Sequence, residues 1–381
     1  MCSKTRAFLP PLLPCRRHEP RGRRAQKLPT TKMAAFDNKT NLTNVSALSC
    51  KFNEDFKYIL LPVSYSLVFV VGLALNATAL YVIVFRTKRW KPSTVYMFNL
   101  TVCDLLYVFS LPFLVYYYAD GNDWPFSEAL CKLIRYLFYA NLYASILFLC
   151  CISLHRFVGI CYPIHSVYWV TGRRARQVSV AVWACVLFCQ APVLYFSRTR
   201  DDTTNHRICY DTTSAEHFED FLVYSSLVSV LLFAVPFVVV MVCYGLMVQT
   251  LLEPGWASEG AGGNATAQRA RQKSVKMIII VLAAFMLCFL PFHVTRSLYY
   301  YFRHLRKVNP TQVSCKFLEA SSVAYKVTRP LASLNSCLDP ILYFLAGQDV
   351  CSNLKKKSKA SASEPKEAQT QSVSQRLTTP L

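Results

Sequence analysis

Long apolar stretches, separated by polar and often basic segments, dominate the chain. An α-helix needs roughly 20 apolar residues to cross the ~30 Å core of a bilayer, and seven stretches are long enough. They are residues 58–85, 94–118, 130–161, 177–196, 221–252, 277–302 and 317–345. The pattern predicts an all-α membrane protein, a seven-helix transmembrane domain (58–345) between an N-terminal tail (1–57) and a C-terminal tail (346–381).

Basic residues gather at alternate connections between these helices. Clusters stand at residues 86–91, 173–176 and 269–276, and another follows the last helix at 355–359. The positive-inside rule places such clusters in the cytoplasm. With an odd number of helices, the N-terminus is then extracellular, and we expect a multi-pass protein of the plasma membrane.

Composition narrows the class of protein further. With 53% hydrophobic and 17% charged residues the chain is too apolar for a soluble domain of 381 residues. The net charge of +21 would suit a nucleic-acid-binding protein. Its concentration at helix ends instead indicates topology and contact with anionic lipid, so we expect no nucleic acid partner. The chain has no Gly-rich phosphate loop, metalloprotease helix or nucleophile elbow, and we predict that it is not an enzyme.

Both tails carry modification and partner signals. Residues 1–32 are basic and lack the apolar region of a signal peptide, so we expect the functional start at Met33. The other signals are glycosylation acceptors at Asn38, Asn41 and Asn44, a palmitoylation site at Cys351 beside basic residues, and a loose PDZ-ligand pattern at Thr379-Pro380-Leu381.

Beyond Met33, four of the sixteen cysteines lie on the extracellular side, where an oxidising environment favours disulfides. Cys131 begins the third helix and Cys209 lies in the outer loop between the fourth and fifth, so we expect these two to pair. Cys50 is then left for Cys315. The long polar loop at 197–218 that carries Cys209 is a candidate lid for a cavity.

The last apolar stretch contains charged residues whose burial in the membrane requires an explanation. A charge near the middle of a membrane helix costs about 2.5–3.5 kcal/mol on insertion scales, so each is a functional-site hypothesis. Lys326 and Arg329 are three residues apart and share a helix face near the outer mouth, whereas Asp339 lies deeper. A retinal pump with Lys326 as Schiff base would need a desolvated lysine with a counterion. The position of Lys326 beside Arg329 disfavours that alternative.

Cations recur at the extracellular ends of three helices that usually adjoin in a seven-helix bundle. They are Arg135 in the third, His293 and Arg296 in the sixth, and Lys326 and Arg329 in the seventh. Several such cations repel one another unless an anion binds, and guanidinium suits phosphate oxygens, so the cluster favours a polyphosphate ligand. Nearby tyrosines are candidates for stacking on a base: Tyr136, Tyr139, Tyr143 and Tyr325. The alternative is that the tyrosines form an interfacial belt and the cations reach the headgroups.

A second polar group lies deeper in the predicted bundle. It comprises Asp104 in the second helix and Asp339 in the seventh, with Ser145, Asn335 and Ser336 as oxygen donors. These oxygens suit a small cation such as sodium, which is the one cofactor we consider. A water-filled polar network without a specific ion is the alternative.

Motifs distributed over the helices give the chain a family resemblance. They are Asn76, Leu100 to Asp104, Cys131, His155-Arg156-Phe157, Trp183, Pro236 with Tyr244, Phe285 to Pro291, and Asn335 through Asp339-Pro340 to Tyr343. Together they resemble the rhodopsin-like G-protein-coupled receptors over residues 50–350. Within that family, His293-x-x-Arg296, Tyr325-Lys326-x-x-Arg329 and Trp124-Pro125-Phe126 resemble the metabotropic purinergic receptors, and most of all the subgroup that responds to ATP and UTP.

The resemblance implies a function and residue roles. Arg135, His293, Arg296 and Arg329 would contact the phosphates of an extracellular nucleotide, with Lys326 nearby. Arg156 would engage a G protein of the Gq class, which activates phospholipase C and raises intracellular calcium. Other residues implied in activation are His155, Tyr244, Asp339, Pro340 and Tyr343. The alternative ligands in the same fold are a lipid phosphate, an acidic peptide, or ADP and UDP.

The chain departs from the family pattern at three positions. His155 replaces an acidic residue, Arg271 stands where some receptors have Glu, and Phe289 replaces the usual Trp before Pro291. We therefore expect no inactive-state salt bridge between Arg156 and the sixth helix, and appreciable basal activity.

Overall fold

The computed structural model describes residues 50, 52–201, 206–210, 213, 217–252 and 265–346. The predicted start at Met33, the glycosylation acceptors, Cys351 and the C-terminal PDZ pattern lie outside these residues.

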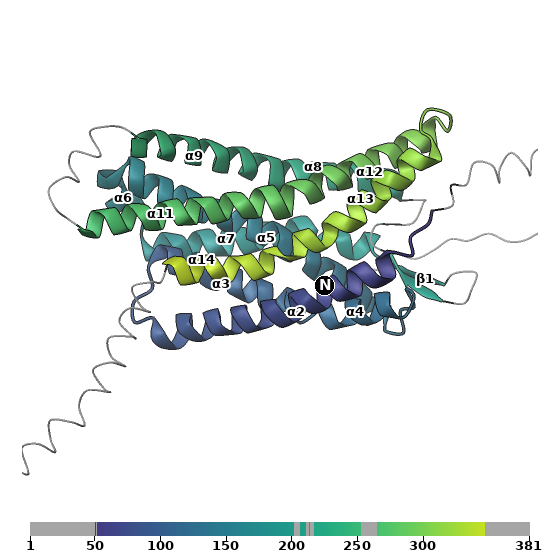
Figure 1. Cartoon of the computed structure of the whole chain (residues 1–381), viewed down its shortest axis with the longest axis horizontal. Helices are drawn as coiled ribbons and strands as arrows, with labels where there is room; N and C mark the ends of the chain where they lie inside the picture. Colours follow the sequence, from purple (N-terminus) through teal and green to yellow (C-terminus); the bar gives the residue numbers. More distant parts are fainter. Residues whose placement is uncertain are drawn as a thin grey trace, which may run out of the picture. The chain divides into compact units, whose positions relative to one another are not determined.

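Six helical segments of the described chain are long and apolar enough to cross a membrane. They run side by side along one direction (Figure 1). In chain order they are built from α2 (Lys57–Tyr81) with η1 (Val82–Arg86), α3 (Pro92–Val108) with α4 (Leu111–Ala119), α5 (Glu128–Cys161), α7 (Gly172–Phe196), α8 (Phe218–Ser229) with η2 (Val230–Ala234) and α9 (Val235–Leu252), and α11 (Ala265–Ala283) with η3 (Ala284–Phe289) and α12 (Leu290–Val308). A short helix, α6 (Pro163–Trp169), follows α5.

The seventh predicted helix is present as two pieces, α13 (Cys315–Ser333) and α14 (Asn335–Ala346), which meet at Leu334. Its charged residues and this interruption explain why it is not among the six apolar segments. In Figure 1, α14 continues α13 along the bundle, and α14 packs against α2 and α3.

Two prolines account for π-helical turns inside the fifth and sixth spans. A proline lacks an N–H, and its ring clashes with the carbonyl four residues earlier. For Pro236 that carbonyl belongs to Leu232 inside η2, and for Pro291 it belongs to Leu287 inside η3. The two turns relieve these clashes and give the spans places to bend.

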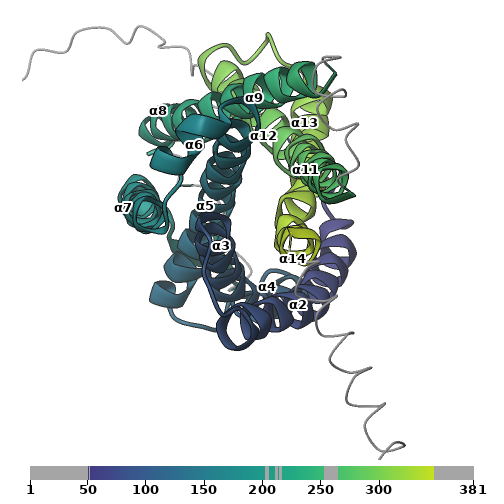
Figure 2. The ribbon, with the colours of Figure 1, turned by 90° about the vertical axis from the view of Figure 1, so that its left-hand side faces the viewer.

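Helix α5 lies deepest in the bundle. Within its most apolar window 78% of the residues are buried, against 28% for α7. It packs against α3, α7 and α9, and in the view along the helices α7 lies outside it (Figure 2). Polar side chains that point inward from α5 are therefore buried in protein.

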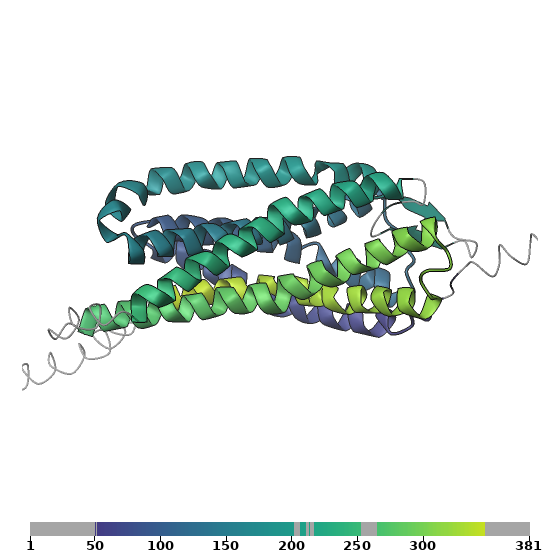
Figure 3. The same cartoon turned by 90° about the horizontal axis from the view of Figure 1, so that it is seen from above.

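A small hairpin and two disulfides organise the end of the bundle predicted to be extracellular. Strands β1 (Thr199–Asp201) and β2 (Arg207–Cys209) pair antiparallel, with Arg200 opposite Ile208. Disulfides join Cys131 to Cys209 and Cys50 to Cys315, the two pairs expected from the sequence. The hairpin and the connection between α12 and α13 lie at the same end of the helices (Figures 1 and 3).

Candidate functional site

A cavity of about 420 Å³ lies at this end, below the hairpin. The N-terminal segment, α2, α4, β2, α12 and α13 all contribute to its wall. Its charged lining residues are Glu54, Lys57, Arg303, Lys326 and Arg329, and its tyrosines are Tyr117, Tyr118, Tyr210, Tyr299 and Tyr325. Four cations thus face one carboxylate among the lining side chains that the structure describes.

Arg329 is held in the wall of this cavity from two sides. Its Nη1 donates to the Tyr118 hydroxyl at 3.2 Å, and its guanidinium carbon is 5.1 Å from the centroid of the Phe138 ring. The side chain is buried. A guanidinium group that aromatic neighbours orient in this way is positioned for bidentate hydrogen bonds to phosphate oxygens.

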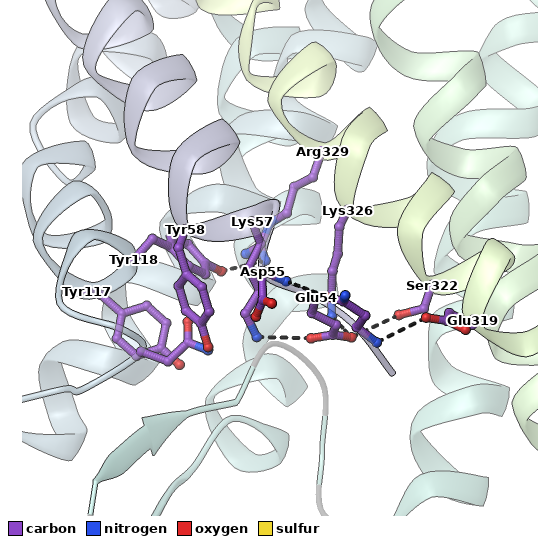
Figure 4. Close-up of polar contacts among 12 residues, drawn as sticks. Glu54, Asp55, Lys57, Tyr58, Tyr117, Tyr118, Glu319, Ser322, Lys326 and Arg329 are labelled. Carbon is purple, nitrogen blue, oxygen red and sulfur yellow. Dashed lines mark hydrogen bonds and ion pairs between the residues drawn. The ribbon is translucent and has the colours of Figure 1, made fainter. Parts of the chain in front are cut away.

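Lys326, one turn earlier on α13, forms an ion pair with Glu54 Oε1. Glu54 also accepts from Lys57 Nζ at 2.9 Å through Oε2 and from the Ser322 hydroxyl at 3.4 Å (Figure 4). Burial alone would raise the pKa of the Glu54 carboxyl, but hydrogen bonds and charge from Lys326 and Lys57 lower it below its ordinary value. The carboxylate is therefore ionised at neutral pH and bridges two ammonium groups.

Tyr325 stacks on Tyr299 across α13 and α12. Their ring centroids are 5.7 Å apart, and the ring planes differ by 10°. The ring centroid of Phe292 lies 5.8 Å from that of Tyr325. The stack forms an aromatic wall beside Lys326, where the sequence predicted contacts to a base.

Arg296 and His293, also predicted to bind phosphate, lie behind this wall rather than in the cavity lining. Arg296 donates to the Tyr143 hydroxyl at 3.1 Å and to the Ser225 hydroxyl at 2.8 Å. Its guanidinium is 4.8 Å from the Tyr139 ring centroid and 5.5 Å from that of Tyr300. The Tyr300 centroid is also 6.0 Å from that of Tyr325, so Tyr300 packs against both Arg296 and the aromatic wall of the cavity.

His293 packs face to face on Phe233, with ring centroids 4.0 Å apart. Its Nδ1 is 3.1 Å from the Ser229 hydroxyl. Arg296 and Ser229 line a separate cavity of about 180 Å³ between α8 and α12. The structure therefore divides the predicted phosphate set into two groups.

Two predicted residues of α5 have other surroundings. Arg135 is buried, and its Nη2 donates to the Cys209 carbonyl at 3.0 Å, so it supports the disulfide-linked strand β2. Tyr136 donates to the Leu187 carbonyl at 3.2 Å and contacts α7. Neither is among the residues that line the 420 Å³ cavity.

Sequence reasoning missed three charged residues of the cavity lining: Glu54, Lys57 and Arg303. One signal was available, because Arg303 is seven residues beyond Arg296 and two helical turns place both on one side of α12. Lys57 begins α2 and Glu54 lies three residues before it, where charges usually mark only the membrane boundary.

The deeper polar group connects α3, α5 and α14. Asn141 Nδ2 donates to Asp104 Oδ1 at 2.8 Å, and the Ser336 hydroxyl donates to Asn141 Oδ1 at 3.4 Å. Three carboxylate oxygens, Asp104 Oδ2 and both oxygens of Asp339, are buried and accept no hydrogen bond from the described residues. The Ser145 hydroxyl and the side-chain amide nitrogen and oxygen of Asn335 are also buried and make no hydrogen bond with the described residues. Buried carboxylate and hydroxyl oxygens fit a hard cation such as sodium.

At the opposite end, Arg156 Nη2 donates to the Met277 sulfur at 3.0 Å, which joins α5 to α11. No ion pair of Arg156 with a carboxylate occurs within the described part of the chain. Nearby, the Tyr244 and Ser153 hydroxyls share a hydrogen bond of 2.6 Å, and Tyr343 and Thr87 share one of 3.2 Å. His155 and Pro340, also implied in activation, lie in α5 and α14.

Comparison with known proteins agrees with this architecture. The family described as 7 transmembrane receptor (rhodopsin family) matches residues 75–343. The chain is 58% identical over 299 residues to purinoceptor 2 of Mus musculus, covering 78% of this chain and 77% of that protein. It is 47% identical over 319 residues to purinoceptor 4 of Rattus norvegicus, covering 84% of each.

The chain therefore belongs to the purinoceptors, within the rhodopsin family of seven-transmembrane receptors. Membership confirms the predicted resemblance and the predicted seven-helix fold. It also confirms that the chain is a multi-pass receptor of the plasma membrane and not an enzyme.

Proposed function

We propose that the chain is a receptor for extracellular nucleotides that responds to ATP and UTP. The observation that carries the proposal is the 420 Å³ cavity, whose wall has four cationic and five tyrosine side chains against one carboxylate. Its volume lies within the range of about 300–1,000 Å³ typical of small-molecule sites. The purinoceptors 2 and 4, at 58% and 47% identity, support the same assignment.

In this proposal Lys326, Arg329, Arg303 and Lys57 hold the phosphates, and the Tyr299–Tyr325 stack faces the base. Arg296 and His293 add to phosphate binding only when Tyr300 moves aside, and Arg135 acts by supporting strand β2. The two groups of the predicted set then have different roles. Lys326 and Arg329 contact the phosphates directly, whereas Arg296 and His293 lie behind these contacts.

Phosphates that bridge α12 and α13 transmit the signal in this scheme. Arg303 lies on α12 and Arg329 on α13, so an anion between them draws the outer ends of the two helices together. A ligand shifts a two-state equilibrium only by its differential affinity for the two states, and this bridge supplies the difference. The π turn η3 lets α11 swing at the inner end, which separates Met277 from Arg156 and admits the G protein.

We assign the G protein to the Gq class, which activates phospholipase C, on the strength of the family resemblance. Intracellular calcium is then the readout. Cells that lack a nucleotide response of their own would express the chain and receive ATP, UTP, ADP and UDP separately, with surface expression verified. We expect both triphosphates to raise calcium. Silence to all four nucleotides would redirect the search to lipid phosphates and acidic peptides.

We also propose that sodium binds between Asp104 and Asp339, supported by the buried oxygens described above. Contact with anionic lipid and PDZ-domain binding at Thr379–Leu381 are sequence-based proposals. A pull-down with a C-terminal peptide tests the PDZ partner, with a peptide that lacks Leu381 as control.

A further inference from the structure

The Glu54 carboxylate accepts contacts from cationic and hydroxyl groups that would equally suit a phosphate group. Its Oε1 meets Lys326 and the Ser322 hydroxyl, and its Oε2 meets Lys57 Nζ at 2.9 Å. All of these groups approach one carboxylate from α2 and α13 (Figure 4). Glu54, Lys57 and Lys326 also line the cavity, so the interaction forms part of its wall.

The chain holds this carboxylate in place. Four residues before Glu54, Cys50 is linked to Cys315 at the start of α13. The Asn53 N–H donates to Glu319 Oε1 at 3.0 Å, and the Lys57 N–H donates to the Glu54 carbonyl at 3.1 Å. A group tethered this close has a high effective concentration at its partners without any free ligand.

The charges around the cavity determine which phosphate chains can displace Glu54. Glu54 compensates Lys57 and Lys326, while Arg303 and Arg329 add two further cations to the same wall. A terminal phosphate carries about −1.5 to −2 charge near pH 7, whereas the carboxylate carries one negative charge. A phosphate chain long enough to reach the two lysines therefore displaces Glu54, and one that ends at the arginines does not.

We propose that Glu54 is a tethered competitor for the terminal phosphate subsite at Lys57 and Lys326, and that it thereby lowers the affinity for nucleoside triphosphates more than that for diphosphates. This inference rests on the proposed nucleotide function and names a residue that distinguishes phosphate chains by their length. The diphosphate, one phosphate shorter, ends at the arginines and leaves Glu54 in place.

The test compares Glu54→Gln with wild type through calcium dose–response curves for ATP, ADP, UTP and UDP, with surface expression measured in parallel. The variant removes the charge and keeps the shape. We expect the preference for triphosphate over diphosphate to rise about fivefold, the change that a partly exposed ion-pair competitor supports. Triphosphate potency should rise, and diphosphate potency should change little.

Glu219→Gln is the matched control. It makes the same chemical change at a carboxylate that pairs with Lys307 and does not line the cavity, and should leave the preference unchanged. Glu54→Asp, which keeps the charge, should stay close to the wild-type preference, and Glu54→Ala should behave as Glu54→Gln, so poor expression of one variant does not decide the result.

The outcomes separate the two proposals. If wild type responds to nucleotides and Glu54→Gln changes triphosphate and diphosphate potency equally, or lowers both, the competitor role is wrong while the nucleotide function stands. Silence of wild type to all four nucleotides would overturn the nucleotide function and this inference with it.

Discussion

Arg296 on α12 donates a hydrogen bond of 3.1 Å to the hydroxyl of Tyr143 on α5. Both side chains are buried, and the Ser225 hydroxyl on α8 accepts a second bond from the same guanidinium at 2.8 Å. One cation thus joins three spans just behind the cavity. Arg329, by contrast, faces the cavity itself, so substitutions at the two arginines should have different consequences.

Arg329→Gln should lower the potency of ATP and UTP about 10- to 100-fold, because a hydrogen bond to a charged group contributes about 1.5–3 kcal/mol. Surface expression should be kept. Calcium dose–response curves measure the effect. Arg198→Gln makes the same change at an exposed arginine of the outer loop that does not line the cavity, and should shift potency little. Unchanged potency in Arg329→Gln would remove Arg329 from the phosphate site.

Tyr143→Phe should reduce thermal stability more than Tyr136→Phe. The first substitution removes a buried acceptor of Arg296, whereas the second removes a donor to the Leu187 carbonyl nearer the surface of the bundle. Leaving a buried charged donor with one partner fewer costs more than losing a neutral bond. Melting of the two purified variants in detergent gives the comparison. Equal melting temperatures would show that Ser225 alone satisfies Arg296.

Met277→Glu should lower basal signalling. The Met277 sulfur is 3.0 Å from Arg156 Nη2, so a carboxylate on this side chain would reach the guanidinium and tie α5 to α11. We expect wild type to signal above empty cells without agonist, Met277→Glu to signal less, and the uncharged Met277→Gln to resemble wild type. A reporter assay after removal of released nucleotides measures all three. Wild-type signal no higher than that of empty cells would contradict the prediction of basal activity.

Glu54 should make stability depend on pH only in the acidic range. Its pKa is lowered in the native protein, so its ion pairs contribute fully above the ordinary Glu value of about 4.3. The contribution is lost as the pH falls through the lower native pKa. The melting temperature of wild type relative to Glu54→Gln should therefore be constant from pH 8 to about pH 5 and converge below about pH 4. Convergence near neutral pH would show that Glu54 is not ionised there.

Much of the fold could be predicted because it follows from apolar length and charge placement. The two disulfides followed from which cysteines lie outside. Within the site, Lys326 and Arg329 were found because charges inside an apolar stretch require a partner. Glu54 and Lys57 could not be found in this way. A charge at a helix boundary is already explained by water and headgroups, so its second role appears only when α13 is placed beside it.

Arg135 illustrates a different limit. Its position on α5 predicts an inward-facing cation at the outer end, and the structure has one. Its partner is the carbonyl of Cys209, and that partner depends on how the disulfide holds strand β2 over the bundle. Helical periodicity gives the side of a helix on which a side chain lies. It does not give which loop lies above.

Sodium should oppose agonist binding through Asp104 and Asp339. A cation held by oxygens from α3 and α14 joins the two helices and resists their rearrangement, so agonist affinity should fall as sodium replaces choline at constant ionic strength. Competition binding on membranes measures the shift. Asp104→Asn removes a carboxylate at the centre of the group and should abolish the sodium effect, whereas Asp123→Asn, in the connection before α5, should retain it. Equal affinities in sodium and choline for wild type would rule out the ion and leave a polar network of protein and water.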